Sequence, residues 1–337
     1  MKKSLIALAV LASSAGLASA QTSSVTLFGV IDVAARYTKS LGQDKSELAS
    51  DGSSSSRLGV RGVEDLGGSL KAGFWLEGAL AADSGTVDAA RFWGRRATVS
   101  LMGDFGEVRL GRAKTMTRLV IDDFDVYSTT GLGDVSKVYR TLGAADTYNR
   151  ADNHAAYFLP GNLGGFYGGV DVGAGEGTVG KKYIGGRVGY KVGALNVGGG
   201  YQSTTGTGNS KVKLGSVGAS YDFGMVRVSG LVSSNRFGST KQTISTIGAA
   251  VPIGASGSLL AQFTNASANT TANEAKLYSL TYLHTLSKRT ALYLTGSRID
   301  NATGAAFRMT SGAGGVQPGT STGFNYSGVD VGVRHSF

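Results

Sequence analysis

The fold is decided by residues 25–37, which read VTLFGVIDVAARY and alternate between two kinds of side chain. One face carries Leu27 and Ile31, and the opposite face carries Thr26 and Asp32. Successive side chains of a β-strand point to opposite sides of the sheet, so a period of two indicates a strand. This stretch therefore predicts a strand with one apolar face and one hydrated face.

The same period recurs to the end of the chain, for example in residues 69–80, 183–192, 226–232 and 329–334. Short connections are expected at 65–68, 103–106, 160–165, 193–194, 223–224, 254–257 and 287–289, and longer ones at 39–54, 81–89, 113–146, 175–180, 205–210, 238–241, 269–273 and 302–323. Strands joined in this way form an antiparallel up-and-down meander, with short turns on one rim and loops on the other. The alternating segments number about sixteen, an even count that is typical of a single-chain bacterial barrel.

The first twenty residues have the features of a secretion signal. Two lysines precede a short apolar run at residues 5–17, and Ala18-Ser19-Ala20 offers a cleavage site before Gln21. The apolar run is too short for a bilayer span. We therefore expect residues 1–20 to be a cleaved signal peptide and residues 21–337 to form one barrel domain. Cleavage would remove two lysines and no acid, so the formal charge falls from +10 to +8.

The composition leaves two classes of secreted protein open. The chain has 53 glycines, 3 prolines and no cysteine, so disulfides and zinc–thiolate sites are excluded. A mean hydropathy of zero fits a soluble periplasmic protein or a transmembrane barrel, whose lipid-facing and lumen-facing residues alternate. The strand period favours the barrel, which must close because a sheet in hydrocarbon cannot leave an edge unpaired. About sixteen strands would enclose an aqueous channel.

Several segments resemble the Gram-negative porin family of β-proteobacteria, and they occur in the expected order. These segments are residues 24–29 (SVTLFG), 56–67 (SRLGVRGVEDLG), 105–112 (FGEVRLGR), 150–153 (RADN) and 286–293 (LSKRTALY). Residues 332–337, which end on Phe337, resemble the signal that outer-membrane barrels present to their insertion machinery. One departure is His154, where the family usually has a hydroxyl residue after Asp152-Asn153.

The resemblance implies a homotrimer of sixteen-stranded barrels in the Gram-negative outer membrane, in contact with membrane lipid and lipopolysaccharide. It also implies that the long third loop, residues 113–146, folds into the lumen and forms the constriction. Such a protein is a general diffusion porin for ions and small hydrophilic solutes. It has no catalytic residue, metal or cofactor, and we expect none here.

Selectivity in such a pore depends on its width and on fixed charges at the constriction. By strand alternation, Arg57 and Arg61 face the lumen opposite Leu58 and Val60, and Arg109 faces inward between Val108 and Leu110. A basic lumen with low-dielectric walls enriches anions. We therefore predict a pore that favours small anions, although each arginine could also be an ordinary solvated wall charge.

Three further arginines complete the predicted constriction. Arg150 has the same parity as His154, which places it toward the lumen. Alternation from Val99 directs Arg96 inward, whereas the family resemblance favours Arg95, and a bulge or strand edge could reconcile the two. Related anion-favouring porins carry clustered wall arginines at positions that resemble Arg57, Arg95 and Arg150.

The third loop contains four acidic candidates, which are Asp122, Asp123, Asp125 and Asp134. If they face the arginines, they impose a transverse field across the constriction. Alternatively, they pair with Arg118, Lys137 or Arg140 and maintain the shape of the loop. The sequence leaves both arrangements open.

Other functions are weaker alternatives. A substrate-specific channel for phosphate or organic acids would need an ordered basic ladder in a tighter pore. An outer-membrane enzyme lacks support, because the G-x-S-x-G match at residues 319–323 lies in a polar loop without the strand and helix of a nucleophile elbow. An adhesin would rely on the loops at 39–54 and 302–323. The basic charge behind a signal peptide, without a nucleic-acid motif, does not indicate nucleic-acid binding.

Overall fold

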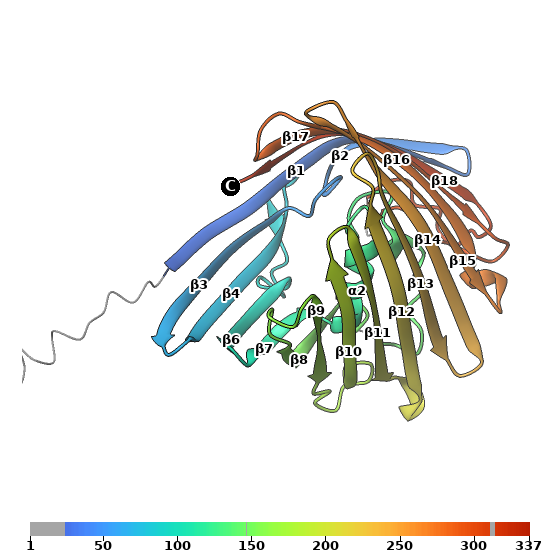
Figure 1. The fold of residues 1–337 in the computed structure, drawn as a ribbon. Coiled ribbons are helices and arrows are strands. Elements are labelled where there is room, and N and C mark those ends of the chain that lie inside the picture. The colour runs from blue at the N-terminus through green and yellow to red at the C-terminus, as the bar shows by residue number, and fades with distance from the viewer. Residues whose placement is uncertain (1–23, 146, 311–313) are drawn as a thin grey trace, which may run out of the picture.

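The computed structural model describes residues 24–145, 147–310 and 314–337, and β-strands dominate it (Figure 1). The strands are β1 (Ser24–Ser40), β2 (Gln43–Ser50), β3 (Arg57–Gly67), β4 (Leu70–Ala81), β5 (Thr86–Val87), β6 (Arg96–Gly103), β7 (Gly106–Lys114), β8 (Arg150–Phe158), β9 (Phe166–Gly173), β10 (Tyr183–Val192), β11 (Leu195–Thr205), β12 (Lys211–Asp222), β13 (Arg227–Phe237), β14 (Thr240–Ile253), β15 (Gly257–Ala268), β16 (Ala275–Thr285), β17 (Thr290–Asn301) and β18 (Asn325–Ser336). The helical segments are α2 (Met116–Phe124), η2 (Val135–Val138), η3 (Thr207–Asn209) and η4 (Thr271–Asn273). The expected signal peptide, residues 1–20, lies outside the described residues.

The strands close into a barrel. Of the eighteen strands in the sheet, β2 and β5 belong to connections, and the other sixteen pair in chain order until β18 meets β1. This last pair is antiparallel and runs from Val30 opposite Ser336 to Ser40 opposite Tyr326. Beyond it, Phe337 and Gly29 exchange both backbone hydrogen bonds, each with an N···O distance of 3.1 Å. The predicted sixteen-stranded, up-and-down antiparallel barrel is confirmed.

The two faces of the wall differ as the period of two predicts. On the outer face, Val217, Val232 and Ile247 are 67%, 52% and 58% exposed. On the inner face, Ser216 and Ser233 are buried and their hydroxyl groups lie 2.8 Å apart. Within the described ranges, no helix is long and apolar enough to cross a membrane.

The expected short turns and longer connections all fall between consecutive wall strands. Two connections contain structure that the sequence analysis did not predict. The loop expected at 39–54 contains β2, because β1 continues past the rim and turns back at Leu41 and Gly42, which both have positive φ. The loop expected at 113–146 contains α2, which lies inside the ring of strands (Figure 1).

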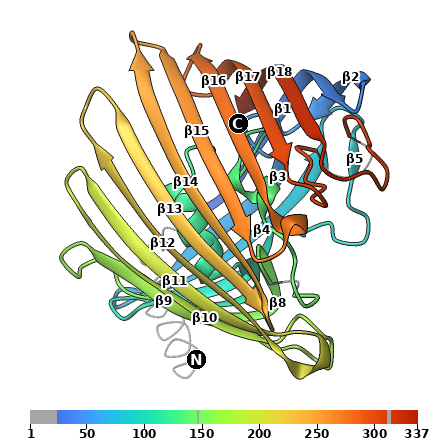
Figure 2. The same ribbon diagram turned by 90° about the vertical axis from the view of Figure 1, so that its right-hand side faces the viewer.

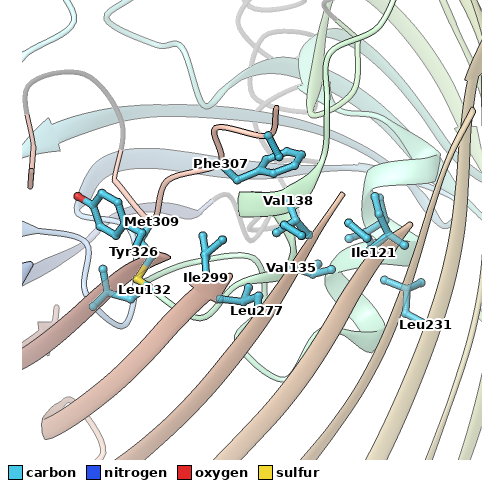
Figure 3. Packing of buried hydrophobic residues seen from close by; sticks show 14 of the residues in the cluster. Ile121, Leu132, Val135, Val138, Leu231, Leu277, Ile299, Phe307, Met309 and Tyr326 are labelled. Atoms are coloured by element: carbon cyan, nitrogen blue, oxygen red, sulfur yellow. The ribbon is translucent and has the colours of Figure 1, made fainter. Parts of the chain in front are cut away.

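The third loop, which spans residues 115–149 in the structure, packs its apolar side chains against one side of the lumen. Ile121, Leu132 and Val135 are fully buried there. They belong to one cluster with wall residues of β12 to β18, among them Leu231 and Ile299 (Figure 3). The hydrophobic core of this protein therefore lies within the barrel, between the third loop and part of the wall.

Glycines on the inner face of the wall provide the space for α2. A Cβ atom on Gly218 would overlap the ring of Phe124. A Cβ on Gly198, on the neighbouring strand, would lie 3.5 Å from Phe124 Cε2, in direct contact with the same ring. The high glycine content of these strands therefore has a packing function, because larger side chains would displace the helix into the channel.

We predict that Gly218→Val lowers the free energy of unfolding by about 1–3 kcal/mol, the usual cost of overpacking a core. Displacement of α2 should also change the single-channel conductance. Gly230→Val is a matched control on the neighbouring strand, because a Cβ there would meet only the carbonyl oxygen of Thr246 at 3.8 Å. Urea unfolding in detergent micelles tests this prediction, and equal effects of the two substitutions would contradict it.

Candidate functional site

The start of the third loop is tied to the wall by a buried carboxylate. The hydroxyl group of Thr115 caps α2 by accepting a hydrogen bond from the backbone N–H of Arg118 at 3.3 Å. The next backbone N–H, that of Met116, donates to Asp171 Oδ2 at 2.8 Å. Tyr183 donates its hydroxyl to the same oxygen at 2.9 Å. These contacts fix the height at which α2 enters the lumen.

His154, the residue that departs from the family pattern, belongs to this anchor. Its Nε2 lies 3.2 Å from Asp171 Oδ2, and both side chains are fully buried. Asn153, just before it, has a φ of 50°, and the pairing of β7 with β8 shifts register at this point. The bulge turns His154 toward the anchor, so the departure changes a local contact and leaves the barrel intact.

The later part of the third loop is organised around Asp125. This carboxylate accepts hydrogen bonds from the backbone N–H groups of Tyr127, Thr129 and Val135, at 3.2, 2.8 and 3.3 Å. It is almost completely buried. Burial, together with the nearby Asp134 carboxylate, raises the pKa of Asp125 to about 7. The carboxylate of Asp125 therefore holds separate parts of the loop backbone together.

The space left beside the loop is a cavity of about 700 Å³. Its cationic lining residues are Arg57, Arg61, Arg95, Arg96, Arg109, Lys114, Arg150 and Arg334. Among the described residues that line it, the only acid is Glu77. The six predicted arginines, which we call the arginine wall, thus line one cavity, together with two cations that the sequence analysis missed.

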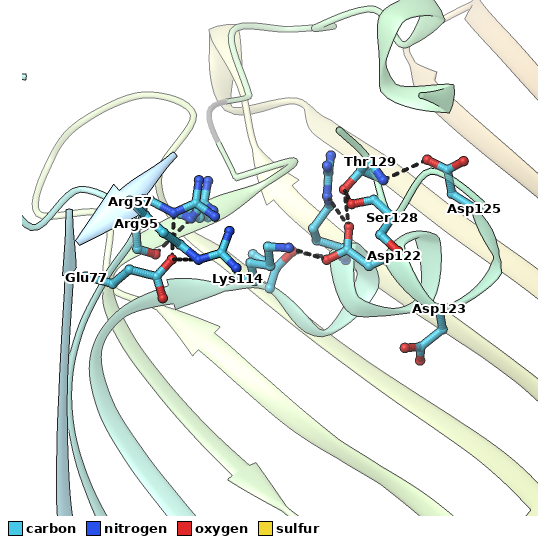
Figure 4. Close-up of polar contacts among 12 residues, drawn as sticks. Arg57, Glu77, Arg95, Lys114, Asp122, Asp123, Asp125, Ser128 and Thr129 are labelled. Carbon is cyan, nitrogen blue, oxygen red and sulfur yellow. Dashed lines mark hydrogen bonds and ion pairs between the residues drawn. The ribbon is translucent and has the colours of Figure 1, made fainter. Parts of the chain in front are cut away.

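Glu77 and backbone carbonyl groups hold three members of the arginine wall, which are Arg57, Arg95 and Arg150. Glu77 Oε1 lies 2.6 Å from Arg95 Nε and 3.8 Å from Arg57 Nε (Figure 4). Arg150 donates from Nε to the carbonyl oxygen of Arg95 at 2.8 Å. Arg57 donates to the carbonyl oxygen of Ser55 at 2.7 Å. A single carboxylate therefore pairs with two arginines, and this part of the cavity keeps excess positive charge.

The structure resolves the choice between Arg95 and Arg96, because both line the cavity. Arg95 lies just before β6 begins, so strand alternation applies to Arg96 and not to Arg95. The guanidinium of Arg96 lies 4.5 Å from the ring centroid of Trp75. Arg61 lies 5.0 Å from the same ring. Contacts of this kind hold a guanidinium in place without neutralising its charge.

Arg109 lies in a separate contact group of the same wall. Its Nε and Nη2 atoms both bind the carboxylate of Glu107 at 2.9 Å. Its guanidinium also lies 4.2 Å from the ring centroid of Phe158. Because Glu107 neutralises it locally, Arg109 adds less free charge to the cavity than Arg57 or Arg150.

The four loop aspartates do not line this cavity. Asp122 binds Lys114 at 2.5 Å and Arg118 at 2.9 Å, and these cations keep the pKa of its carboxyl below the usual value. Asp123 binds Arg187 on β10 at 3.0 Å. In Figure 4, Asp123 and Asp125 lie on the side of the loop away from the arginines. Asp122 thus has the pairing with Arg118 that the sequence offered as one of two arrangements, whereas Asp123 pairs with an arginine of the wall.

Asp134 has a similar local role. Its carboxylate caps η2 by accepting from Ser136 N at 2.7 Å, and it lies 3.4 Å from Lys137 Nζ. It also lines a second cavity, of about 470 Å³, which shares Arg95, Lys114 and Arg150 with the first. The two cavities therefore adjoin through the same cations. Arg140, by contrast, donates to the carbonyl oxygen of Ala272 and binds none of the four aspartates.

Two cations of the cavity were missed at the sequence level. Arg334 lies opposite Val333 in the strand pattern, so the same alternation that indicated Arg109 could have indicated it. It donates to Ser53 Oγ at 3.3 Å. Lys114 ends β7, where alternation gives no guidance, and its pairing with Asp122 depends on the loop conformation.

Comparison with known proteins gives a consistent result. A family model described as Gram-negative porin matches residues 7–304. The chain is 41% identical to outer membrane porin protein 32 of Delftia acidovorans over 100% of both chains. It is 27% identical to an outer membrane porin protein of Bordetella pertussis, again over 100% of both. Among solved structures, the anion-selective porin from Comamonas acidovorans aligns with a TM-score of 0.83 and 37% identity, over 94% of this chain and 100% of that chain.

The raised pKa of Asp125 predicts a pH-dependent stability. In an unfolded chain this carboxyl titrates near ~3.9, whereas in the fold it titrates near about 7. The folded chain binds this proton more tightly than the unfolded chain does, so protonation of Asp125 stabilises the fold. This contribution to stability is complete below about pH 4 and is lost as the pH rises through about 7. Asp125→Asn cannot titrate, so we expect it to remove this part of the pH dependence.

The measurement is the midpoint of thermal unfolding in neutral detergent, across a pH series, for both proteins. Asp222→Asn, at an exposed turn on the opposite rim, is the control and should follow the wild type. An Asp125→Asn variant with an unchanged pH dependence would show that this carboxyl does not carry the effect.

Proposed function

The chain belongs to the Gram-negative porin family and forms a diffusion pore in the outer membrane, and from that premise we propose that its constriction favours anions. The family and the fold are those of channels and not of enzymes. Small hydrophilic solutes and ions cross such a pore passively, through the water beside the third loop. The proposal concerns which of them the arginine wall favours.

The observation that carries this proposal is the unequal charge of the constriction cavity. Eight cationic side chains and one carboxylate line it. Fixed charge on the low-dielectric walls of a narrow aqueous space focuses the electrostatic field and enriches the opposite ion. Chloride and small organic anions are therefore enriched there, and potassium is depleted. The name of the related porin from Comamonas acidovorans, which describes it as anion-selective, supports the same assignment.

We assign different roles to the residues of the constriction. Arg57, Arg95 and Arg150 provide the free positive charge, because Arg57 and Arg95 share the single carboxylate of Glu77 and Arg150 donates to the carbonyl oxygen of Arg95. Arg61 and Arg96, which both contact the ring of Trp75, add further positive charge. Arg109 adds little, because Glu107 neutralises most of its charge. The aspartates at 122, 123, 125 and 134 hold the third loop in place, and none of them lines the constriction cavity. A substrate-specific channel for phosphate or organic acids remains the alternative.

Further parts of the proposal concern maturation and assembly. We propose cleavage of residues 1–20, recognition of Phe337 by the barrel-insertion machinery, assembly into a homotrimer, and contact with outer-membrane lipid and lipopolysaccharide. Phe337 suits this role because its backbone completes the closing strand pair, so insertion and closure would involve the same end of the chain.

The test is the zero-current potential of the purified protein in a planar bilayer under a tenfold potassium chloride gradient. A perfectly selective pore would give about 59 mV, with a sign that identifies the preferred ion. We expect a chloride-selective sign. Replacement of Arg57, Arg95 and Arg150 with serine should remove more than half of this potential, because the free charge of the cavity is lost.

Two variants control this experiment. Lys39, Lys276 and Arg298 are exposed on the outer face, and their joint replacement with serine removes the same charge without changing the lumen. That variant should keep the wild-type potential. Glu77→Gln removes the acid of the cavity, so it should shift the potential further toward chloride. Cation selectivity of the wild-type pore, or folded protein without conductance steps, would refute the proposal.

A further inference from the structure

A row of three cations crosses the outer face of the barrel. Lys213 on β12 lies directly opposite Arg236 on β13, and Arg236 lies directly opposite Lys241 on β14. All three residues are exposed. The strands that carry them lie side by side in both views of the molecule (Figures 1 and 2). We call these three residues the outer basic row.

The outer basic row lies on the side of the wall that faces the membrane and not the lumen. Its neighbours along the chain, Val212 and Gln242, are buried on the inner face. Along the outer face of β13, Val232 belongs to the apolar band, and Arg236 follows four residues later, where β13 ends at the connection to β14. The row therefore lies at the edge of the apolar band.

This edge is on the rim that carries the longer connections. The turn between β13 and β14 is on the same rim as the third loop. The strands that precede these two connections, β13 and β7, run in the same direction along the barrel. In bacterial barrels the longer loops are extracellular and the short turns are periplasmic. The outer basic row is thus at the level of the outer-leaflet headgroups.

Three like charges in this arrangement cost stability if nothing neutralises them. Directly opposite residues on adjacent antiparallel strands have Cα atoms only ~4.5–5.5 Å apart, and like charges at such positions are destabilising. In the described part of the chain, no ion pair or hydrogen bond to the side chains of Lys213, Arg236 and Lys241 is present. Between Glu176 and Glu274, the only acid in the sequence is Asp222, at the other end of β12.

Three other outward cations of the barrel have acidic neighbours. Lys39 lies opposite Asp44, Lys276 lies opposite Asp300, and Arg298 binds Asp300 at 2.6 Å. The outer basic row differs from them because the cross-strand partners of Arg236 are two further cations and no acid lies opposite Lys213. An external anion is the partner that would convert this repulsion into binding.

We propose that the outer basic row binds the phosphate groups of lipopolysaccharide in the outer leaflet, an inference that rests on the lipopolysaccharide contact proposed above. Phosphate carries several acceptor oxygens, which suit the forked donors of Arg236 and the ammonium groups of Lys213 and Lys241. The adjoining apolar band, with Val217 and Val232, would contact the acyl chains of the same molecule. Lys211, two residues from Lys213 and also exposed, extends the site toward the loops.

The test compares wild-type protein with a triple variant, Lys213→Gln, Arg236→Gln and Lys241→Gln, in neutral detergent micelles. Each protein is titrated with bisphosphorylated lipid A while its thermal unfolding midpoint is followed. We expect lipid A to raise the wild-type midpoint. In the triple variant, the lipid A concentration that gives half of this rise should increase about a hundredfold. The reason is that three cations, each of which attracts the anionic headgroup, have been removed.

Three comparisons make the result decisive. Without lipid A, the triple variant should unfold at the wild-type temperature or above it, because repulsion has been relieved. Lipid A without phosphate should stabilise both proteins equally and weakly. The matched control, Lys39→Gln, Lys276→Gln and Arg298→Gln, should keep the wild-type response. An unchanged response of the triple variant, or an equal loss in the matched control, would overturn the proposal, and neither outcome bears on ion selectivity.

Discussion

The pairing of β18 with β1 is the constraint on which the rest of the molecule depends. In a bilayer, a backbone group without a partner costs several kcal/mol, so the sheet is stable only when its two edges meet. Here the meeting includes the last residue, since Phe337 and Gly29 exchange their backbone hydrogen bonds. Closure of sixteen strands then creates a lumen that side chains of the wall cannot fill. The third loop fills part of it.

The loop occupies the lumen unequally, and this asymmetry produces the site. Its apolar side chains, such as Phe124 and Leu132, pack on the walls formed by β10 to β18, where inner-face glycines leave room for them. The strands β3 to β8 are left uncovered, and these carry the arginine wall. The loop uses its own aspartates to bind Lys114, Arg187 and backbone N–H groups, and none of them lines the cavity beside the arginine wall. Packing thus determines the charge of the channel.

Strand periodicity alone predicted the wall strands, their connections and the inward direction of Arg57, Arg61 and Arg109. It could do so because every strand touches lipid on one side and the lumen on the other. Periodicity says nothing of which residues on neighbouring strands lie opposite one another, so neither Glu77 beside Arg95 nor the outer basic row was found. It also fails in loops, so α2, Lys114 and the partners of Asp122 required the structure. Arg95 was ambiguous because it precedes its strand.

The central claim is that fixed positive charge in the lumen, and not pore width, determines which ions pass. The most direct test is the zero-current potential of the wild-type pore at a constant tenfold gradient, measured at increasing mean salt concentration. Mobile ions screen fixed charge over a Debye length of ≈ 30 Å at 0.01 M and only 3 Å at 1 M. The account predicts a strong chloride preference in dilute salt that declines toward zero in concentrated salt. A preference that does not change with salt, or one for potassium, would contradict it.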